Sequence, residues 1–243
     1  MPGFVVGAGY GYKESISNVY KHCRDNEGCV RVFATDKVAS KCVQLTDIDA
    51  DSWSHPDFVL SVNTEETSAV KLEEWYELVA TDTALILPVT AHPSHVRWWL
   101  RYHGGPIYWM VPNNIDKDLS ELWAGKYGVP AMPRGSNSGE FAWLMASLLG
   151  CKPIGLIGMT YAWKTLKEVL DMQSVEKYDY HEFYDEEKHC YTTLGFMSQR
   201  TEFLEYVSIY GKDTKTYNLS EGGILYNEDV KRMTVKEFLE KFI

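Results

Sequence analysis

The chain has 243 residues, of which 45% are hydrophobic and 24% charged, a composition typical of globular rather than disordered proteins. With 24 Lys and Arg against 34 Asp and Glu, the formal net charge is -10, which predicts that the protein binds neither nucleic acid nor an anionic membrane. The amino-terminal sequence MPGFVVGAGYGYKES resembles no secretion signal, and no window approaches the ~20 apolar residues of a membrane span, so we expect a cytoplasmic protein.

Apolar runs that end in polar turns alternate with helical patterns along most of the chain. Residues 4–6 predict a buried strand that leads, through Gly7-Ala8-Gly9, into an amphipathic helix over residues 15–24. Further strands are predicted over residues 30–34, 58–60, 84–87, 107–111, 153–157 and 214–217, and further helices over residues 94–103, 141–149, 196–210 and 234–242. The alternation predicts one α/β domain over residues 1–243, a Rossmann-like, doubly wound and mostly parallel sheet with helices on both faces.

Residues 171–191 interrupt this alternation with an acidic and aromatic sequence that has no clear period. We predict an insertion that forms a mobile lid, because it follows the strand ending at Gly158 and therefore lies at the carboxyl end of a parallel sheet. Tyr178, Tyr180, Phe183 and Tyr184 would then cover a ligand. The alternative is a helix-rich insertion whose aromatic side chains pack permanently on the body.

The glycine-rich turn after the first strand is one candidate binding site. Gly7-Ala8-Gly9-Tyr10-Gly11 opens a helix, where backbone amides can approach a phosphate. A dinucleotide fingerprint would place glycine at position 12, where this chain has Tyr12. The turn therefore predicts a phosphate-carrying ligand other than NAD, or it serves only the close packing of helix and sheet.

A second candidate is the sequence RGSNSGE over residues 134–140, just before an apolar helix. Arg134, the hydroxyl groups of Ser136 and Ser138, and free amides at the helix start suit a phosphate or carboxylate. The alternative is a plain helix cap made by Ser136 or Asn137.

The sequence predicts no metal site with a complete ligand set. Asp47, Asp49 and Asp51 alternate as in a calcium loop, but the required glycine and distal glutamate are missing. His92 and His95 lack further ligands at suitable spacing. The odd number of cysteines, five, favours reduced thiols.

Four segments together resemble one protein family in the correct order: VVGAGYGYKESI, PDFVLSVNTEE, RGSNSGEFAWLMASLLGCKPIGLIGMTYAW and YNLSEGGILY. The family is the domain shared by archaeal hydroxymethyldihydropterin pyrophosphokinases of the MptE type and by bacterial motility accessory factors that act as flagellin nonulosonic-acid transferases. The resemblance covers nearly the whole chain. It implies a Rossmann-like, sialyltransferase-like fold that binds a nucleotide.

The resemblance also implies which residues form the site. Asp36 and Glu221 are the candidate catalytic residues. Together with the loops at the strand ends, the resemblance predicts that the nucleotide-binding or phosphate-binding residues are Gly7, Ala8, Gly9, Asp36, Asn63, Gly135, Ser136, Asn137, Ser138, Gly158, Met159, Thr160, Glu221 and Gly222.

Three functions are compatible with these residues. The first is a transferase that uses a nucleotide-activated sugar, because SVN at residues 61–63 is closer to the transferase branch than to the acidic TDLD-like segment of the pyrophosphokinases. The second is ATP-dependent pyrophosphoryl transfer, for which Asp36, Asp57 and Glu65 would have to hold Mg²⁺. The third is a nucleotide-binding module without catalytic activity. No other cofactor is implied, and the oligomeric state is not predicted.

Overall fold

A computed structural model describes residues 1–23, 28–39, 55–62, 82–102, 105–113, 116–133, 135–171, 180–184 and 189–243. Its main feature is a nine-stranded sheet in the order β11-β10-β7-β1-β2-β3-β4-β5-β6, in which every neighbouring pair is parallel. The strands are β1 (Gly3–Val6), β2 (Arg31–Thr35), β3 (Phe58–Leu60), β4 (Ala84–Pro88), β5 (Ile107–Pro112), β6 (Ala131–Met132), β7 (Ile154–Ile157), β10 (Thr216–Asn218) and β11 (Val230–Arg232). The prediction of a mostly parallel α/β sheet is confirmed.

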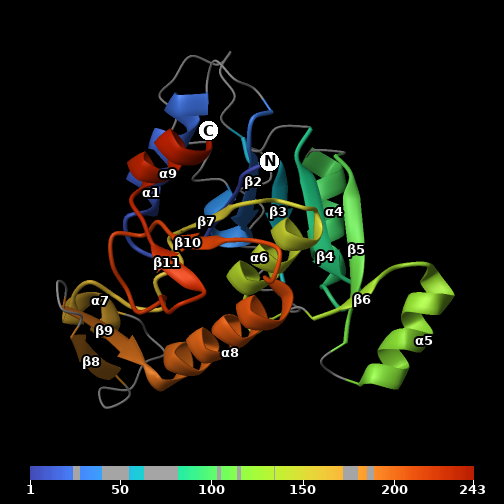
Figure 1. Cartoon of the computed structure of the whole chain (residues 1–243). Coiled ribbons are helices and arrows are strands. Elements are labelled where there is room, and N and C mark those ends of the chain that lie inside the picture. Colours follow the sequence, from blue (N-terminus) through green and yellow to red (C-terminus); the bar gives the residue numbers. More distant parts are fainter. Residues whose placement is uncertain are drawn as a thin grey trace.

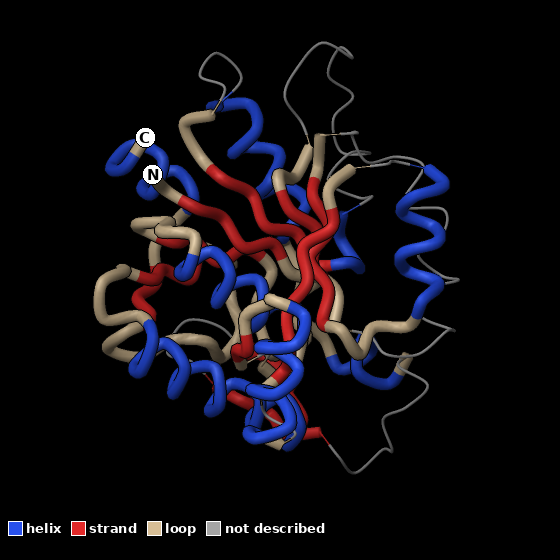
Figure 2. Tube along the Cα trace, turned by 90° about the vertical axis from the view of Figure 1, so that its right-hand side faces the viewer, coloured by secondary structure: helices blue, strands red, loops and turns tan. Residues whose placement is uncertain are grey.

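Helices cover both faces of the sheet (Figures 1 and 2). One layer contains α1 (Tyr12–Cys23), α4 (Pro93–Tyr102) and α9 (Val235–Phe242), and the other contains α6 (Ser138–Leu148) and α8 (Leu194–Tyr210). Successive strand residues point to opposite faces, so Phe4 and Val6 pack in the first layer and Val5 packs in the second. Both faces of β1 are therefore buried, as expected for a central parallel strand.

Helix α6 is apolar on nearly every side because it lies between the sheet and α8. Its Phe141, Trp143 and Leu144 are buried. The Trp143 indole N–H donates to the hydroxyl of Thr216 at 3.0 Å, and its ring meets Phe203 of α8 edge-on at 5.5 Å. A helix that is covered on nearly every side needs no polar stripe.

Several elements were not predicted from the sequence. They are β6, β11, α5 (Lys117–Tyr127), α7 (Leu166–Leu170) and an antiparallel hairpin of β8 (Tyr180–Tyr184) and β9 (His189–Thr193). Helix α5 stands away from the body beyond β6, at the right of Figure 1.

The hairpin occupies the described part of the predicted lid, which is thus a pair of strands rather than helical. Its strand β9 is tied to the loop after β7, because Trp163 and Tyr191 exchange backbone hydrogen bonds of 2.7 and 2.9 Å and Thr192 donates its hydroxyl to the Tyr161 carbonyl. Lid closure stays a prediction, and Tyr178 lies outside the described residues.

Within the described part of the chain, no helix combines the length and apolar character needed to span a membrane. Cys23, Cys29, Cys151 and Cys190 are free thiols, and Cys42 lies outside the described residues. The cytoplasmic location stays a prediction.

Candidate functional site

The strand order changes direction between β1 and β7. From β1 the chain builds β2 to β6 on one side, and from β7 it builds β10 and β11 on the other. The chain therefore continues from these two strands toward opposite sides of the sheet. In open α/β sheets, ligands bind in the crevice at such a switch point.

The loops after β1 and β7 pack backbone against backbone. Gly7 donates its amide to Ile157 at 2.8 Å, and Gly9 donates to the carbonyl of Gly158 at 2.7 Å. A Cβ atom on Gly9 would lie 2.4 Å from the Gly158 oxygen, and one on Gly158 would lie 2.3 Å from the Gly7 oxygen. Glycine is thus required at both loops because any side chain would force them apart.

A third loop, residues 219–225 after β10, closes on the same point. The Ile224 amide donates to the Thr160 carbonyl at 3.0 Å, and a Cβ on Gly223 would collide with the Thr160 backbone. The Tyr10 ring reaches across to this loop, where a Cβ on Gly222 would lie 2.4 Å from the phenol oxygen. Burial raises the pKa of Tyr10 to about 12, so the phenol stays protonated. Three predicted site segments are therefore brought together.

The amides of Gly7 and Gly9 are already used in these contacts. Close packing thus accounts for both glycines, in line with the alternative reading of the turn. Ala8 between them is exposed. A phosphate at this turn would therefore meet the backbone around Ala8 and the start of α1 rather than the glycine amides.

The Gly135–Ser138 turn is occupied by a carboxylate of the chain itself. Glu140 accepts hydrogen bonds from the Ser136 amide at 2.6 Å, from the Ser136 hydroxyl at 2.9 Å and from the Asn137 side-chain amide at 2.8 Å. Asn137 also caps α6 by accepting from the amides of Gly139 and Glu140. Gly135, with φ of 70°, curves the backbone around the carboxylate, where a Cβ would lie 2.7 Å from a Glu140 oxygen.

Glu140 is the functional candidate that sequence reasoning missed. It is 1% exposed, and the Tyr161 hydroxyl donates to it at 3.0 Å. Burial raises its pKa from 4.5 to about 7, although hydrogen bonds from Ser136 and Tyr161 act in the opposite direction. Tyr161 has a φ of 48°, a positive value not found at any other described non-glycine residue. Unusual pKa values and strained backbone are common in functional sites.

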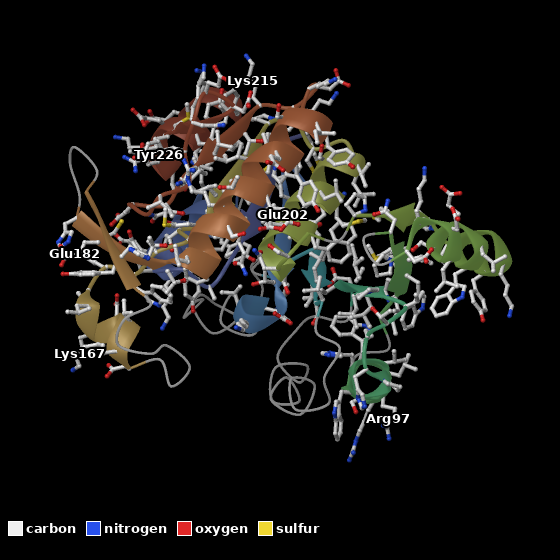
Figure 3. The ribbon with its side chains drawn as sticks, turned by 90° about the horizontal axis from the view of Figure 1, so that it is seen from below. Arg97, Lys167, Glu182, Glu202, Lys215 and Tyr226 are labelled. Carbon is white, nitrogen blue, oxygen red and sulfur yellow. The ribbon has the colours of Figure 1, made fainter. Side chains whose placement is uncertain are left out.

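A second carboxylate lies near this cluster. Glu202 of α8, near the middle of Figure 3, contributes to the raised pKa of both Glu140 and Tyr161, and it accepts from the Tyr206 hydroxyl at 2.9 Å. A sequence signal for Glu140 did exist: an Asn cap followed three residues later by Glu is the spacing of a capping box.

The two candidate catalytic carboxylates do not lie together. Asp36, at the carboxyl end of β2, is buried and accepts from the Ser61 hydroxyl at 2.6 Å and the Lys37 amide at 2.8 Å. Glu221 is exposed on the loop after β10. Three strand spacings separate β2 from β10, roughly 14 Å. The two carboxylates therefore follow strands that are not neighbours in the sheet.

The remaining predicted residues are placed as follows. Met159 and Thr160 are buried beneath the switch point, and a methyl group of Met159 would lie 3.1 Å from a Cβ on Gly139 of α6. The loop after β7 thus links the first turn to the α6 turn. Asn63 and Arg134 lie outside the described residues.

The proposed magnesium ligands do not fit the structure. Asp57 lies at the amino end of β3, where it binds Arg31 at 2.6 Å and the Val32 amide at 2.8 Å. Asp36 lies at the opposite edge, four residues or roughly 13 Å along β2 from Val32. The prediction that both hold one Mg²⁺ is wrong, and Glu65 lies outside the described residues.

No group of three His, Cys, Asp or Glu side chains with metal-binding geometry occurs in the described ranges. His92 is bonded to the Ser94 hydroxyl at 2.9 Å, at the start of α4. His95 is fully buried in the same helix, and burial lowers its pKa to about 4. The aspartates at 47, 49 and 51 lie outside the described residues.

The strand order and these contacts define an α/β protein in which three loops meet at the switch point of a parallel sheet. Its fold is similar to that of the MAf glycosyltransferase from Magnetospirillum magneticum AMB-1, with a TM-score of 0.67 and 13% sequence identity. The alignment covers 97% of this chain and 34% of that protein, so the chain spans about a third of its length. No model of a protein family and no curated protein matches the sequence.

At this level of identity the similarity establishes the fold. The expected resemblance to motility accessory factors is therefore supported at the level of the fold. The similarity to pyrophosphokinases and the roles of single residues stay predictions.

Proposed function

We propose that the protein is a transferase that binds a nucleotide-activated sugar at the switch point between β1 and β7. The observation that carries the proposal is the convergence of three glycine-containing loops, after β1, β7 and β10, on one point at the carboxyl edge of the sheet. In each loop, a glycine lets the backbone come closer to a neighbouring loop than a side chain would allow. The fold similarity to a glycosyltransferase supports the same class of reaction.

The phosphate would lie against the turn around Ala8, where the exposed backbone and the start of α1 favour an anion. The Ser136–Ser138 turn lies at the start of α6, which the loop after β7 contacts through Met159. Its role in phosphate binding stays a prediction, because the Ser136 donors are used by Glu140. Of the residues predicted from the sequence, we propose that the exposed Ala8 and Glu221 contact the ligand. A role of Asp36 in orienting ribose hydroxyls stays a prediction, because it is buried and both of its carboxylate oxygens already accept hydrogen bonds.

Calorimetric titration at low salt with CMP, CDP, ADP, GDP and UDP at millimolar concentrations tests the proposal. We expect binding of at least one nucleotide. The variant Ala8→Glu places a negative charge at the exposed turn and should weaken that binding at least tenfold. Ser208→Glu, on the exposed surface of α8, is the matched charge control and should bind like the original protein. Absence of binding to all five nucleotides would contradict the proposal.

Two other functions can be distinguished from the proposed one by their reaction products. Pyrophosphoryl transfer would release AMP from ATP in the presence of Mg²⁺ and hydroxymethyldihydropterin. A module without catalytic activity would bind a nucleotide tightly and turn over no donor. The separation of Asp36 from Asp57 argues against pyrophosphoryl transfer.

A further inference from the structure

A groove of about 640 Å³ opens at the carboxyl edge of the sheet, beside the first turn of α1. Its walls are α1, the loop after β10 and the start of α9. The polar side chains that line it include Glu14, Asn18, Ser220, Glu221, Thr234 and Glu237. Only Glu221 among these belongs to the site residues predicted from the sequence.

The lining of the groove does not suit a phosphate. It contains three carboxylates, those of Glu14, Glu221 and Glu237, against the two cations Arg232 and Lys236. The Arg232 guanidinium stacks on Tyr226 at 3.9 Å and donates to the Gly223 carbonyl at 3.0 Å, so it is already engaged. The excess of negative charge would repel a phosphate group.

The lining does not suit a nucleobase either. No aromatic side chain among the described residues lines the groove, so a base would find no ring on which to stack. What remains is carboxylate, amide and hydroxyl chemistry. Carboxylates accept hydrogen bonds from hydroxyl groups, and amides both donate and accept, which is the pattern that a sugar requires.

The loop that carries Glu221 is held rigidly. Asn218 donates to the Leu225 carbonyl at 2.8 Å and accepts from the Ser220 amide at 2.9 Å, so one side chain joins both ends of the loop. Arg200 of α8 donates hydrogen bonds from its guanidinium group to the carbonyls of Ile224 and Tyr226. A preformed loop loses little conformational entropy when it binds a ligand.

One buried hydroxyl on this loop is unpaired within the part of the chain that the structure describes. The Oγ of Ser220 is buried and has no hydrogen-bond partner among the described residues. Buried hydroxyl groups normally have a partner, so this atom is a candidate to bond with a ligand or a water in the groove.

The groove and the proposed phosphate position are connected by the first turn of α1. Helix α1 begins at Tyr12, directly after the turn around Ala8, and Glu14 lies in its first turn, within about 5 Å along the helix axis. A sugar attached to a phosphate at that turn would reach Glu14, and Asn18 lies one further turn along the same face.

We propose that this groove binds the glycosyl part of the nucleotide-activated sugar, with Glu14 and Asn18 of α1 contacting its hydroxyl groups. The inference rests on the proposed function and assigns to α1 a role in sugar recognition.

The test compares a free nucleotide with the corresponding nucleotide sugar by calorimetry. The pairs are UDP with UDP-glucose and CMP with CMP-N-acetylneuraminate. In the double variant Glu14→Ala/Asn18→Ala, both replaced side chains are exposed and lie in a helix that tolerates alanine, so the fold should be unchanged. The control is Glu228→Ala, which removes an exposed carboxylate outside the groove.

We expect the double variant to raise the Kd of the nucleotide sugar about tenfold and to leave the Kd of the free nucleotide within twofold. Equal weakening of both ligands would mean that the groove holds the nucleotide, and unchanged affinity for both would mean that it holds neither. Either result would overturn the inference while leaving the proposed function in place. Absence of binding to every ligand by the original protein would overturn both.

Discussion

Glu140 lies in an environment that opposes the charge of its carboxylate. A carboxylate 1% exposed loses almost all its hydration, and the donors on Ser136, Asn137 and Tyr161 replace it only in part. The result is a pKa raised from 4.5 to about 7. Between these two pH values the folded protein keeps a proton that the unfolded chain has released, so the free energy of unfolding falls as pH rises through this range.

We expect this dependence to disappear in Glu140→Gln. The stability of the original protein relative to this variant should fall by between about 2 and 3 kcal/mol from pH 5 to pH 8. Urea unfolding of both proteins at these two pH values measures the difference, in which the contributions of all other groups cancel. Glu228→Gln controls for the loss of one negative charge. A difference that is the same at pH 5 and pH 8 would contradict the assignment.

At the scale of elements, the loops after β1 and β7 approach each other closely at glycine positions. Both Gly158 in this contact and Gly128 at the end of α5 have a φ of 65°, but a Cβ on Gly128 would meet nothing within 4 Å. The two positions therefore share the cost of a left-handed backbone and differ only in the space around them.

We expect Gly128→Ala to destabilise the protein by about 1 kcal/mol, and Gly158→Ala by at least about 2 kcal/mol more, because its Cβ would displace the Gly7 backbone. Urea unfolding at a single pH measures both. Gly158→Ala should also weaken nucleotide binding, whereas Gly128→Ala should leave it intact. Equal losses of stability would show that the two loops can separate freely.

The burial of each element explains whether its sequence pattern could predict it. Central strands such as β1 and β4 are buried on both faces, and their continuous apolar runs predicted them within one residue. Helix α5 went unpredicted although its signals were present, namely the Asp116 cap and the Gly128 terminator, because its apolar residues do not face a core. The hairpin of β8 and β9 carries no clear alternation.

The candidate site was predicted as six separate segments. That they lie at one edge follows from a parallel sheet, and the sequence is sufficient for that inference. The contact of Gly9 with Gly158 depends on β1 and β7 being neighbours, a long-range pairing that no local pattern encodes. The separation of Asp57 from Asp36 also depends on a long-range strand pairing, because Asp57 lies at the amino end of β3.

Across the whole molecule, burial declines from the centre of the sheet to the edge at β6. The side chains of β1 and the apolar side chains of β7 are fully buried, whereas Ser120 is the sole buried residue of α5. The apolar side chains of α5 are exposed by 39 to 66%, and they are Leu119, Leu122, Trp123 and Tyr127. A surface helix normally turns such residues toward a core.

This gradient predicts how the molecule opens. We expect the amides of β1 and β7 to exchange with solvent only on global unfolding, whereas those of α5 exchange through local opening several orders of magnitude faster. Hydrogen exchange at increasing urea below the unfolding transition separates the two, since urea strongly accelerates global opening and hardly affects local opening. Protection of α5 equal to that of β1 would contradict the prediction, and its dependence on protein concentration would then show whether a second copy covers the apolar face of α5.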